Sequence, residues 1–254
     1  MSFFEPLGDG RFRATEHTRG PWDPAHQHAG PAAALLGGLL EGLHTREEML
    51  LARITLEILG PIPVGEVTVQ VGVERPGRSV ELLAGELSAG GRTAVRARAW
   101  RVARAAAPPT PDAGPPPPLP DAEAPLPEAF GDFGYGRAIE WRYAAGAWLE
   151  PGPATVWTRL RVGVLAGAPP TPLQRVLAVA DSGNGVSAVL AWSRFRFINP
   201  ELTVHVLRAP VGEWVCLDAV TEIAAGGAGL ARSVLSDRSG PVARGMQSLL
   251  VAPR

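Results

Sequence analysis

The sequence predicts an α+β protein made of two tandem units, each with a long buried helix wrapped by an antiparallel β-sheet. First, a strand–turn–strand pattern occurs at residues 53–67 and again at residues 199–214, and self-similarity on this scale indicates a repeated unit. Second, each half contains an apolar helical segment, at residues 31–43 and at residues 172–180. Third, runs that alternate apolar and polar residues, typical of half-buried strands, follow each segment.

Composition excludes several classes of protein. With 254 residues and a hydrophobic content of 46%, the chain is long enough for two domains with a sizeable core. The formal net charge of -1 provides no overall field that would attract nucleic acid or an anionic membrane. No apolar segment approaches the ~20 residues of a spanning helix, and the N-terminus lacks a signal-peptide pattern. We expect a cytoplasmic protein with no membrane insertion and no nucleic-acid partner.

The chain has no Lys, and all 24 basic residues are Arg, which is typical of a GC-rich coding bias. Scattered arginines are therefore weak evidence for phosphate binding.

In the first half, a short strand at residues 10–15 and a loop precede the first helix, which Pro31 opens. Pro suits the first helical position because its missing N–H would be unpaired there anyway. The helix is apolar almost all round, as expected when a helix is buried on every side. Gly37 and Gly38 allow another element to approach it closely. The predicted strands that follow are residues 53–59, 66–75, 79–89 and 93–102.

An Ala/Pro-rich tract at residues 105–128 has no apolar periodicity and predicts a semi-extended linker. It separates an N-terminal unit, residues 1–104, from a C-terminal unit, residues 129–254. In the second unit the helix at residues 172–180 ends near Asp181. The predicted strands of this unit are residues 138–143, 155–162, 191–198, 203–208, 213–223, 229–237 and 242–251.

Several motifs occur together along the chain: Pro21-Trp22, His28-Ala-Gly30-Pro, Asp181-Ser-Gly-Asn184, Asn199-Pro-Glu-Leu-Thr203 and Gly240-Pro-Val-Ala-Arg-Gly-Met-Gln247. With these motifs the sequence resembles the type II acyl-CoA thioesterase family and its thioesterase-like relatives. The resemblance covers most of the chain except the Ala/Pro-rich tract. It implies a double hot-dog fold and hydrolysis of an acyl-CoA to a free acid and CoA, with no cofactor and no metal.

In that family an Asp on the second helix, a Ser or Thr beside the next strand and a Gln on the last strand together hold a water. Carried over by motif, the Asp is Asp181 and the Gln is Gln247. The hydroxyl position falls on Asn199, which can donate and accept hydrogen bonds but has no hydroxyl. Thr203, four residues further on, is a second candidate for this position.

The chemistry of thioester hydrolysis gives these residues roles. The reaction needs a water aimed at the carbonyl carbon, a base for its proton and a donor for the oxyanion. Asp181 is the candidate base, because an apolar pocket would raise its pKa, and Gln247 is a candidate to orient the water. Backbone N–H groups around Gly30 are candidate oxyanion donors, and His28 is a candidate substrate-binding residue.

Each residue also has a structural interpretation. Asp181 could cap a turn, Gln247 could face solvent, and Cys216, in a strand pattern, is interpreted as a buried structural thiol. A metal site at His26 and His28 would lack a third ligand.

Two other functions stay open. One is a hydratase or dehydratase that uses His28 and Asp181, and the other is a non-catalytic acyl-thioester binding protein, which Asn199 favours. In our internal alignment Gln247 matches Arg98, so we expect a single site, in the second half. Copies of the chain are expected to pair, if they do, through sheet edges.

Overall fold

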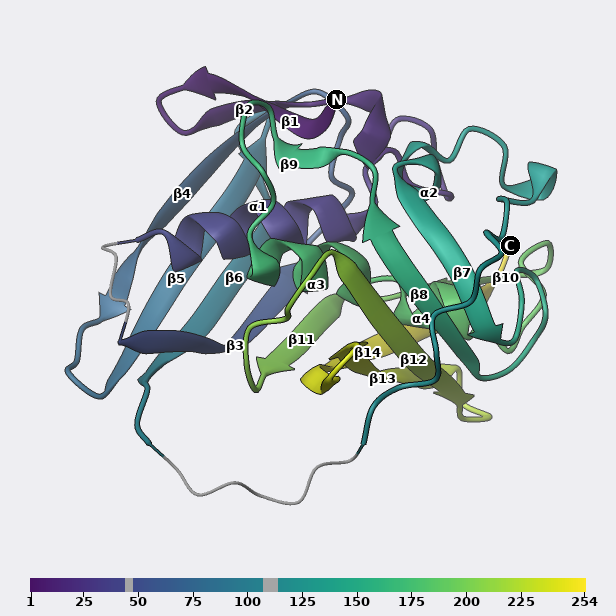
Figure 1. Cartoon of the computed structure of the whole chain (residues 1–254). Helices are drawn as coiled ribbons and strands as arrows, with labels where there is room; N and C mark the ends of the chain where they lie inside the picture. Colours follow the sequence, from purple (N-terminus) through teal and green to yellow (C-terminus); the bar gives the residue numbers. More distant parts are fainter. Residues whose placement is uncertain (44–47, 107–113) are drawn as a thin grey trace.

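The computed structural model describes residues 1–43, 48–106 and 114–254 and has an α+β fold (Figure 1). The helices are α1 (Ala29–Glu41), α2 (Gly134–Arg137), α3 (Pro172–Ala180) and α4 (Gly183–Val186). The strands are β1 (Ser2–Gly8), β2 (Arg11–Ala14), β3 (Met49–Ile58), β4 (Glu66–Arg75), β5 (Val80–Ala89), β6 (Arg92–Ala103), β7 (Ile139–Ala145), β8 (Ala154–Leu160), β9 (Gly163–Leu165), β10 (Phe195–Ile198), β11 (Glu201–Val206), β12 (Trp214–Ile223), β13 (Ala228–Asp237) and β14 (Gly240–Pro253).

Within the described residues these strands form one 14-stranded sheet. Its order is β7-β8-β12-β13-β14-β11-β3-β6-β5-β4-β2-β1-β9, and β10 pairs with β14 beside this path. The sheet curves around α1 and α3, which lie in its interior (Figure 1). Each predicted strand overlaps an observed one, and β4 and α3 have the predicted bounds.

Two strands, β1 and β9, were not predicted from the sequence, and they pair with each other in parallel. β1 contains Pro6, and proline is typical of turns. β9 is only three residues long. Their register, Ser2 with Gly163 and Phe4 with Leu165, joins segments that are far apart in the sequence. No local pattern predicts such a pairing.

Helix α1 begins earlier than expected. It starts at Ala29, and the His28 side chain caps it by accepting a hydrogen bond from the Gly30 N–H. Pro31 is therefore the third helical residue and not the first. It is tolerated there because the first four N–H groups of a helix have no partner within the helix.

The close contact between α1 and α3 depends on glycine. A Cβ atom on Gly37 would collide with Leu177, and one on Gly38 would collide with Gln174. The prediction that these glycines allow a close approach is confirmed, and the approaching element is α3. The residues of α1 are buried almost all round, as predicted. No helix in the described part of the chain has the length and apolar character needed to cross a membrane.

The two repeated strands of the sequence pair with each other at the centre of the sheet. β11 runs antiparallel to β3, with Thr203 opposite Thr55, Leu202 opposite Leu56 and Val204 opposite Ile54. The register is symmetric about the two threonines, whose hydroxyl oxygens lie 3.2 Å apart.

This register corrects our internal alignment. The residue of β14 opposite Thr203 is Met246, and the residue of β6 in the equivalent place is Arg98. Gln247 therefore matches Ala99, one residue away from the predicted Arg98. A slip of one residue changes the face of a strand: Ala99 and Gln247 are buried, whereas Arg98 is exposed.

The predicted linker, of which residues 107–113 lie outside the described part, is more than a spacer. Residues 114–127 run along β7 and β8 and are held by hydrogen bonds. The Trp157 indole N–H donates to the Pro117 carbonyl (3.0 Å), and the Arg142 guanidinium donates to another carbonyl of the segment. Part of the sheet edge at β7 is thus covered by the chain itself, and pairing of copies through sheet edges stays a prediction.

Candidate active site

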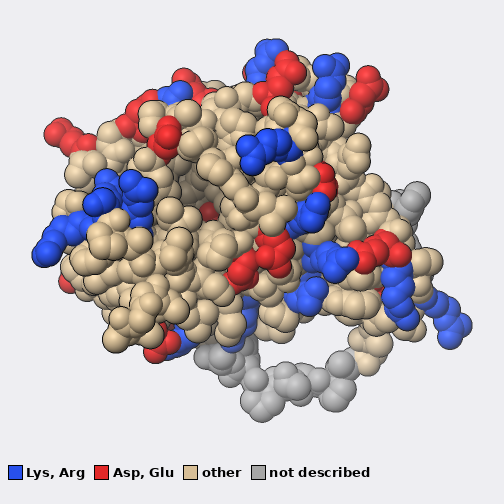
Figure 2. Space-filling view, turned by 180° about the vertical axis from the view of Figure 1, so that it is seen from behind, with Lys and Arg blue, Asp and Glu red and all other residues tan. Residues whose placement is uncertain are grey.

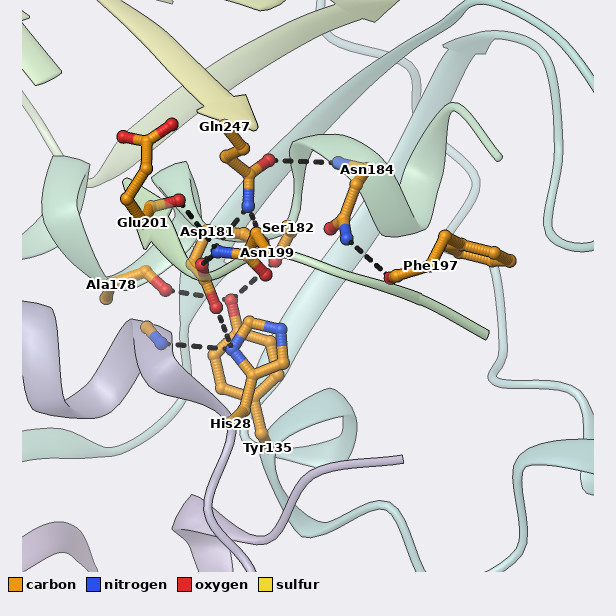
Figure 3. Close-up of polar contacts among 11 residues, drawn as sticks. His28, Tyr135, Ala178, Asp181, Ser182, Asn184, Phe197, Asn199, Glu201 and Gln247 are labelled. Atoms are coloured by element: carbon orange, nitrogen blue, oxygen red, sulfur yellow. Dashed lines mark hydrogen bonds and ion pairs between the residues drawn. The ribbon is translucent and has the colours of Figure 1, made fainter. Parts of the chain in front are cut away.

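The centre of the site is the carboxylate of Asp181, the residue that follows the last turn of α3 (Figure 3). Its side chain is 4% exposed. Oδ1 accepts hydrogen bonds from Asn199 Nδ2 (2.7 Å) and from Gln247 Nε2 (3.1 Å). The backbone N–H groups of Ala29 and Gly30, at the start of α1, also stabilise the charged form of this carboxylate. Three predicted site residues from α3, β14 and the loop before β11 thus meet at one group.

Burial raises the pKa of Asp181 to about 7, because removal from water disfavours the charged form of a carboxyl group. The hydrogen bonds from Asn199, Gln247 and the start of α1 act in the opposite direction and limit the rise. The result is a carboxyl group that exchanges its proton near neutral pH, which is the range in which a general base is most effective.

Gln247 is fully enclosed and does not face solvent. Its side chain is 2% exposed, and its Oε1 accepts from the Asn184 backbone N–H (3.1 Å). Its Nε2 donates to the Asp181 backbone carbonyl (3.0 Å) as well as to the carboxylate. Partners on both sides fix the amide orientation, so that Gln247 presents a donor to Asp181.

Asn199 and Thr203 occupy different places. Both hydrogens of the Asn199 amide are used, because Nδ2 also donates to the Glu201 carbonyl (3.2 Å). In the part of the chain that the structure describes, its Oδ1 has no protein partner. The Thr203 hydroxyl instead lies 3.2 Å from the Thr55 hydroxyl and from a Glu201 carboxylate oxygen, on the pair β11–β3. The structure brings Asn199, and not Thr203, to the Asp181 carboxylate.

His28 lies between the start of α1 and Asp181. Its Nδ1 accepts from the Gly30 N–H (3.1 Å) and is 3.3 Å from Asp181 Oδ2. Burial lowers the pKa of His28 to about 3, so the imidazole is neutral. Because Nδ1 accepts a hydrogen bond, the single ring proton is on Nε2. The Gly30 N–H, a predicted oxyanion donor, is engaged with His28 and Asp181.

Tyr135 is a site residue that the sequence analysis missed. Its ring stacks on that of His28, with centroids 3.9 Å apart and an interplanar angle of 4°. Its hydroxyl donates to the Ala178 carbonyl (2.8 Å) and is 2.7 Å from Ser182 Oγ. The available signals were the rarity of Tyr, with only two in the chain, and the position of Ser182 within the motif that begins at Asp181.

Four of these residues, His28, Tyr135, Asp181 and Asn199, line a cavity of ≈ 420 Å³. His28, Asp181 and Asn199 supply polar groups to its wall. Most of the remaining wall is apolar, and its aromatic members are Trp22, Phe130, Phe133, Tyr135, Trp141, Trp148 and Trp192. Figure 2 shows a hollow on this side of the molecule with an acidic side chain at its floor. An apolar cavity that ends in a few polar groups is typical of a small-molecule site.

The other candidate groups have structural surroundings. Cys216 is buried in β12, and burial raises the pKa of its thiol to about 12, opposite to the shift that a nucleophile needs. His26 Nδ1 faces Asp23 at 3.4 Å, whereas His28 faces Asp181. Among the described residues, no group of three or more His, Cys, Asp or Glu side chains could hold a metal ion.

Comparison with known families gives two matches that together span most of the chain. Residues 18–102 match the family model "Acyl-CoA thioesterase N-terminal domain", and residues 108–251 match "Acyl-CoA thioesterase C-terminal domain". The comparison with curated proteins gave no match.

Solved structures resemble the chain over nearly its whole length. A candidate thioesterase II from Thermobifida fusca YX has a TM-score of 0.77 at 16% identity and covers 98% of this chain and 95% of its own. A candidate thioesterase from Novosphingobium aromaticivorans has a TM-score of 0.73 at 22% identity and covers 98% of both chains. A hot-dog-fold protein from Alicyclobacillus acidocaldarius has a TM-score of 0.72 at 15% identity and covers 97% of this chain and 95% of its own. At these identities the likeness shows the fold.

Proposed function

The chain belongs to the acyl-CoA thioesterase family, and on that premise we propose that it hydrolyses an acyl-CoA thioester with a water activated by Asp181. The observation that carries the proposal is a buried carboxylate with a pKa of about 7 in the wall of an apolar, aromatic-lined cavity. The thioester lies in this cavity, with its carbonyl beside Asp181.

We also propose that the fold is a double hot-dog. One unit comprises residues 1–104 and the other residues 129–254, joined by the Ala/Pro-rich tract. The symmetric register of β3 and β11 about Thr55 and Thr203 supports this division. The separate N-terminal and C-terminal family matches support it as well.

The attacking water is held by two acceptors. Asn199 Oδ1, which has no protein partner within the described residues, accepts one hydrogen, and the Asp181 carboxylate accepts the other. The water then points a lone pair at the thioester carbonyl carbon. Asn199 can fill the family's Ser or Thr position in this way because its amide oxygen accepts as a hydroxyl oxygen would. Gln247 holds Asp181 in place from the other side.

The reaction proceeds by addition and elimination. As the water oxygen bonds to the carbonyl carbon, Asp181 takes a water proton; as the C–S bond breaks, that proton passes to the departing CoA thiolate. The products are a carboxylic acid and CoA.

The oxyanion donor in this proposal is the Nε2–H of His28. The Gly30 N–H fixes the tautomer by donating to Nδ1, and the lowered pKa of the ring keeps it neutral. The ring borders the cavity, so the Nε2–H is available to the carbonyl oxygen. A fixed donor in a site with little water stabilises developing negative charge without reorganising.

Thiol release from acyl-CoA, followed with a thiol-reactive dye, tests the function. We expect release by the unaltered protein and a loss of 10²–10⁴-fold in Asp181→Asn, the range that general bases contribute. Asp218→Asn, which removes an exposed carboxylate on β12, is the matched control and should keep the full rate. Full activity of Asp181→Asn would remove Asp181 from the mechanism.

The same assay separates the other two functions. Binding of acyl-CoA without thiol release would indicate an acyl-thioester binding protein. The His28–Asp181 contact at the cavity wall is the one feature that favours a hydratase or dehydratase. Consumption of an enoyl-CoA, seen as a loss of ultraviolet absorbance without thiol release, would identify that activity.

A further inference from the structure

Three arginines gather where β10 meets the end of β14. In the antiparallel pair of β10 and β14, Phe195 lies opposite Pro253 and Arg196 lies opposite Ala252. Just beyond this pair, the Arg254 N–H donates to the Arg194 carbonyl (3.0 Å). Arg194 and Arg254 are thus opposite each other, and Arg196 is two residues from Arg194. Only Arg196 lies within a strand; Arg194 precedes β10 and Arg254 follows β14, so the three residues are neighbours at one end of this strand pair. Figure 2 shows a cluster of basic side chains at this end of the molecule, beside the hollow.

Without a bound anion, this arrangement of three positive charges destabilises the folded protein. Like charges directly opposite each other on paired strands are destabilising. In the part of the chain that the structure describes, no acidic side chain forms an ion pair with Arg194, Arg196 or Arg254. Some arginines do pair with a carboxylate, such as Arg101 with Glu81. The cluster therefore has unused capacity to bind an anion.

The cluster and the cavity are continuous. Further along the same ribbon, Ile198 lies opposite Leu250, and both line the cavity. The Arg254 guanidinium lies over the ring of Trp22, 5.3 Å from its centroid, and Trp22 also lines the cavity. Arg254 and Trp192 line a second hollow, of ≈ 480 Å³, and Trp192 belongs to both. Arg254 thus borders a hollow that adjoins the cavity of Asp181, and Arg194 lies opposite Arg254.

The length of the path from Asp181 to the arginines matches the pantetheine arm of CoA. From Asn199 to Arg194 the chain advances five residues, or about 16 Å at about 3.3 Å per residue. The arm has about thirteen bonds from sulfur to phosphorus, equivalent to about four extended residues, or roughly 15 Å. A thioester carbonyl at Asp181 therefore puts the phosphates of the same molecule at the arginines.

We propose that Arg194, Arg196 and Arg254 bind the phosphate groups of the 3′-phospho-ADP part of CoA. This inference rests on the proposed function, because it takes the thioester to lie at Asp181. Guanidinium groups suit the role, since their planar fork matches two phosphate oxygens at once. The site selects thioesters of CoA over thioesters of carriers that lack these phosphates.

Such contacts act at a distance from the reacting carbonyl, so they bind the substrate and the transition state equally. Their loss raises KM and leaves kcat unchanged. Because the arginines are exposed, each contact is screened by water and salt. We expect KM for acyl-CoA to rise about ten- to hundredfold when all three are replaced.

The test compares two triple variants on two substrates. The first variant is R194Q/R196Q/R254Q, and the matched control is R75Q/R78Q/R92Q. The control replaces three exposed arginines near the β4–β5 and β5–β6 turns, at the opposite end of the molecule (Figure 1). The substrates are one acyl-CoA and the same acyl group on pantetheine, which has no phosphate. We expect the first variant alone to show a raised KM, for acyl-CoA alone, with kcat unchanged.

Other outcomes overturn the inference. Equal KM values for acyl-CoA in both variants would show that the arginines do not bind the phosphates, and a KM raised equally for both substrates would indicate general damage to the site. If the unaltered protein releases no thiol from either substrate, the proposed function fails. Calorimetric titration with CoA itself then tests the arginines: weaker binding by the first variant only supports the site, and equal binding by both variants excludes it.

Discussion

Replacement of Asp181 by Asn is expected to change stability in a way that depends on pH. The folded protein holds the pKa of this carboxyl group at about 7, against an ordinary value of 3.8. A raised pKa means that the folded state binds the proton more tightly than the unfolded chain does. The resulting stability is fully present below pH 3.8 and is lost as the pH rises through about 7. The Asn variant has no proton to lose and lacks this dependence.

The size of the effect follows from the shift. Each pKa unit corresponds to 1.36 kcal/mol, so a rise of about three units amounts to about 4 kcal/mol over the full pH range. Between pH 5 and pH 8 the change is about 3 kcal/mol, since part of the shift lies below pH 5. Relative to the unaltered protein, Asp181→Asn should therefore gain about 3 kcal/mol in free energy of unfolding across this interval. The gain arises because the unaltered protein must keep a charged carboxylate buried at high pH.

Urea denaturation at several pH values, followed by tryptophan fluorescence, measures this difference. Asp237→Asn is the control, because Asp237 is also a buried carboxyl group. Burial alone would raise the pKa of Asp237, but hydrogen bonds from Arg208 and from backbone N–H groups lower it to about 2. Asp237 is thus ionised throughout pH 5–8. The change in free energy of unfolding caused by Asp237→Asn should therefore be the same at every pH in that range.

The same ionisation should appear in catalysis. In the proposed mechanism Asp181 acts as a base only when ionised, so kcat/KM should rise with pH through a midpoint near 7 and then level off. The kinetic midpoint and the midpoint of the stability difference report one group in the free protein and should coincide. A stability difference between Asp181→Asn and the unaltered protein that stays constant from pH 5 to pH 8 would refute the reasoning.

The remaining predictions concern the partners of Asp181. Gln247→Ala leaves the buried partners of this amide without their hydrogen bonds. It should therefore lower kcat about 10²-fold, measured by thiol release. It should also lower the free energy of unfolding by about 1–3 kcal/mol, measured by urea denaturation. Asn199→Ala should move the midpoint of the pH–rate profile upward, since a hydrogen bond to the charged form is lost; an unchanged midpoint would contradict this. Arg98→Gln should leave kcat/KM unchanged, because Arg98 lies on the outer face, and a selective loss of activity would be evidence against a single site.

Much of the fold was predictable because its signals are local. The alternating runs predicted most strands, and the apolar segment that contains Gly37 and Gly38 predicted a buried helix in close contact with another element. The parallel pairing of β1 with β9 was not predictable, since it depends on the packing of the whole chain. The alignment of Gln247 with Arg98 failed for a different reason. Similarity between two repeats shows where a strand lies in the sequence. It does not fix which residues of the strand point inward, because a shift of one residue in the alignment moves every side chain to the opposite face.

In the candidate site, too, the residues with local sequence signals were predicted and those placed by long-range packing were not. The motifs predicted that Asp181, Gln247 and Asn199 form one group, and the structure brings them together. The contacts of Tyr135 were beyond prediction, because they come from a short helix distant in sequence from both helices that it touches. The cap formed by His28 was missed because Pro31 suggested a later helix start.

The glycines of α1 connect the fold to the chemistry of Asp181. A Cβ on Gly30 would collide with the Ala178 carbonyl, so the absence of a side chain lets the start of α1 touch the end of α3. At this contact the N–H groups of Ala29 and Gly30 reach the Asp181 carboxylate. Burial alone would raise the pKa of Asp181 further, and these donors oppose the rise by stabilising the charged form. The same close packing that excludes water from Asp181 thus supplies the donors that hold the pKa of this carboxyl group near 7.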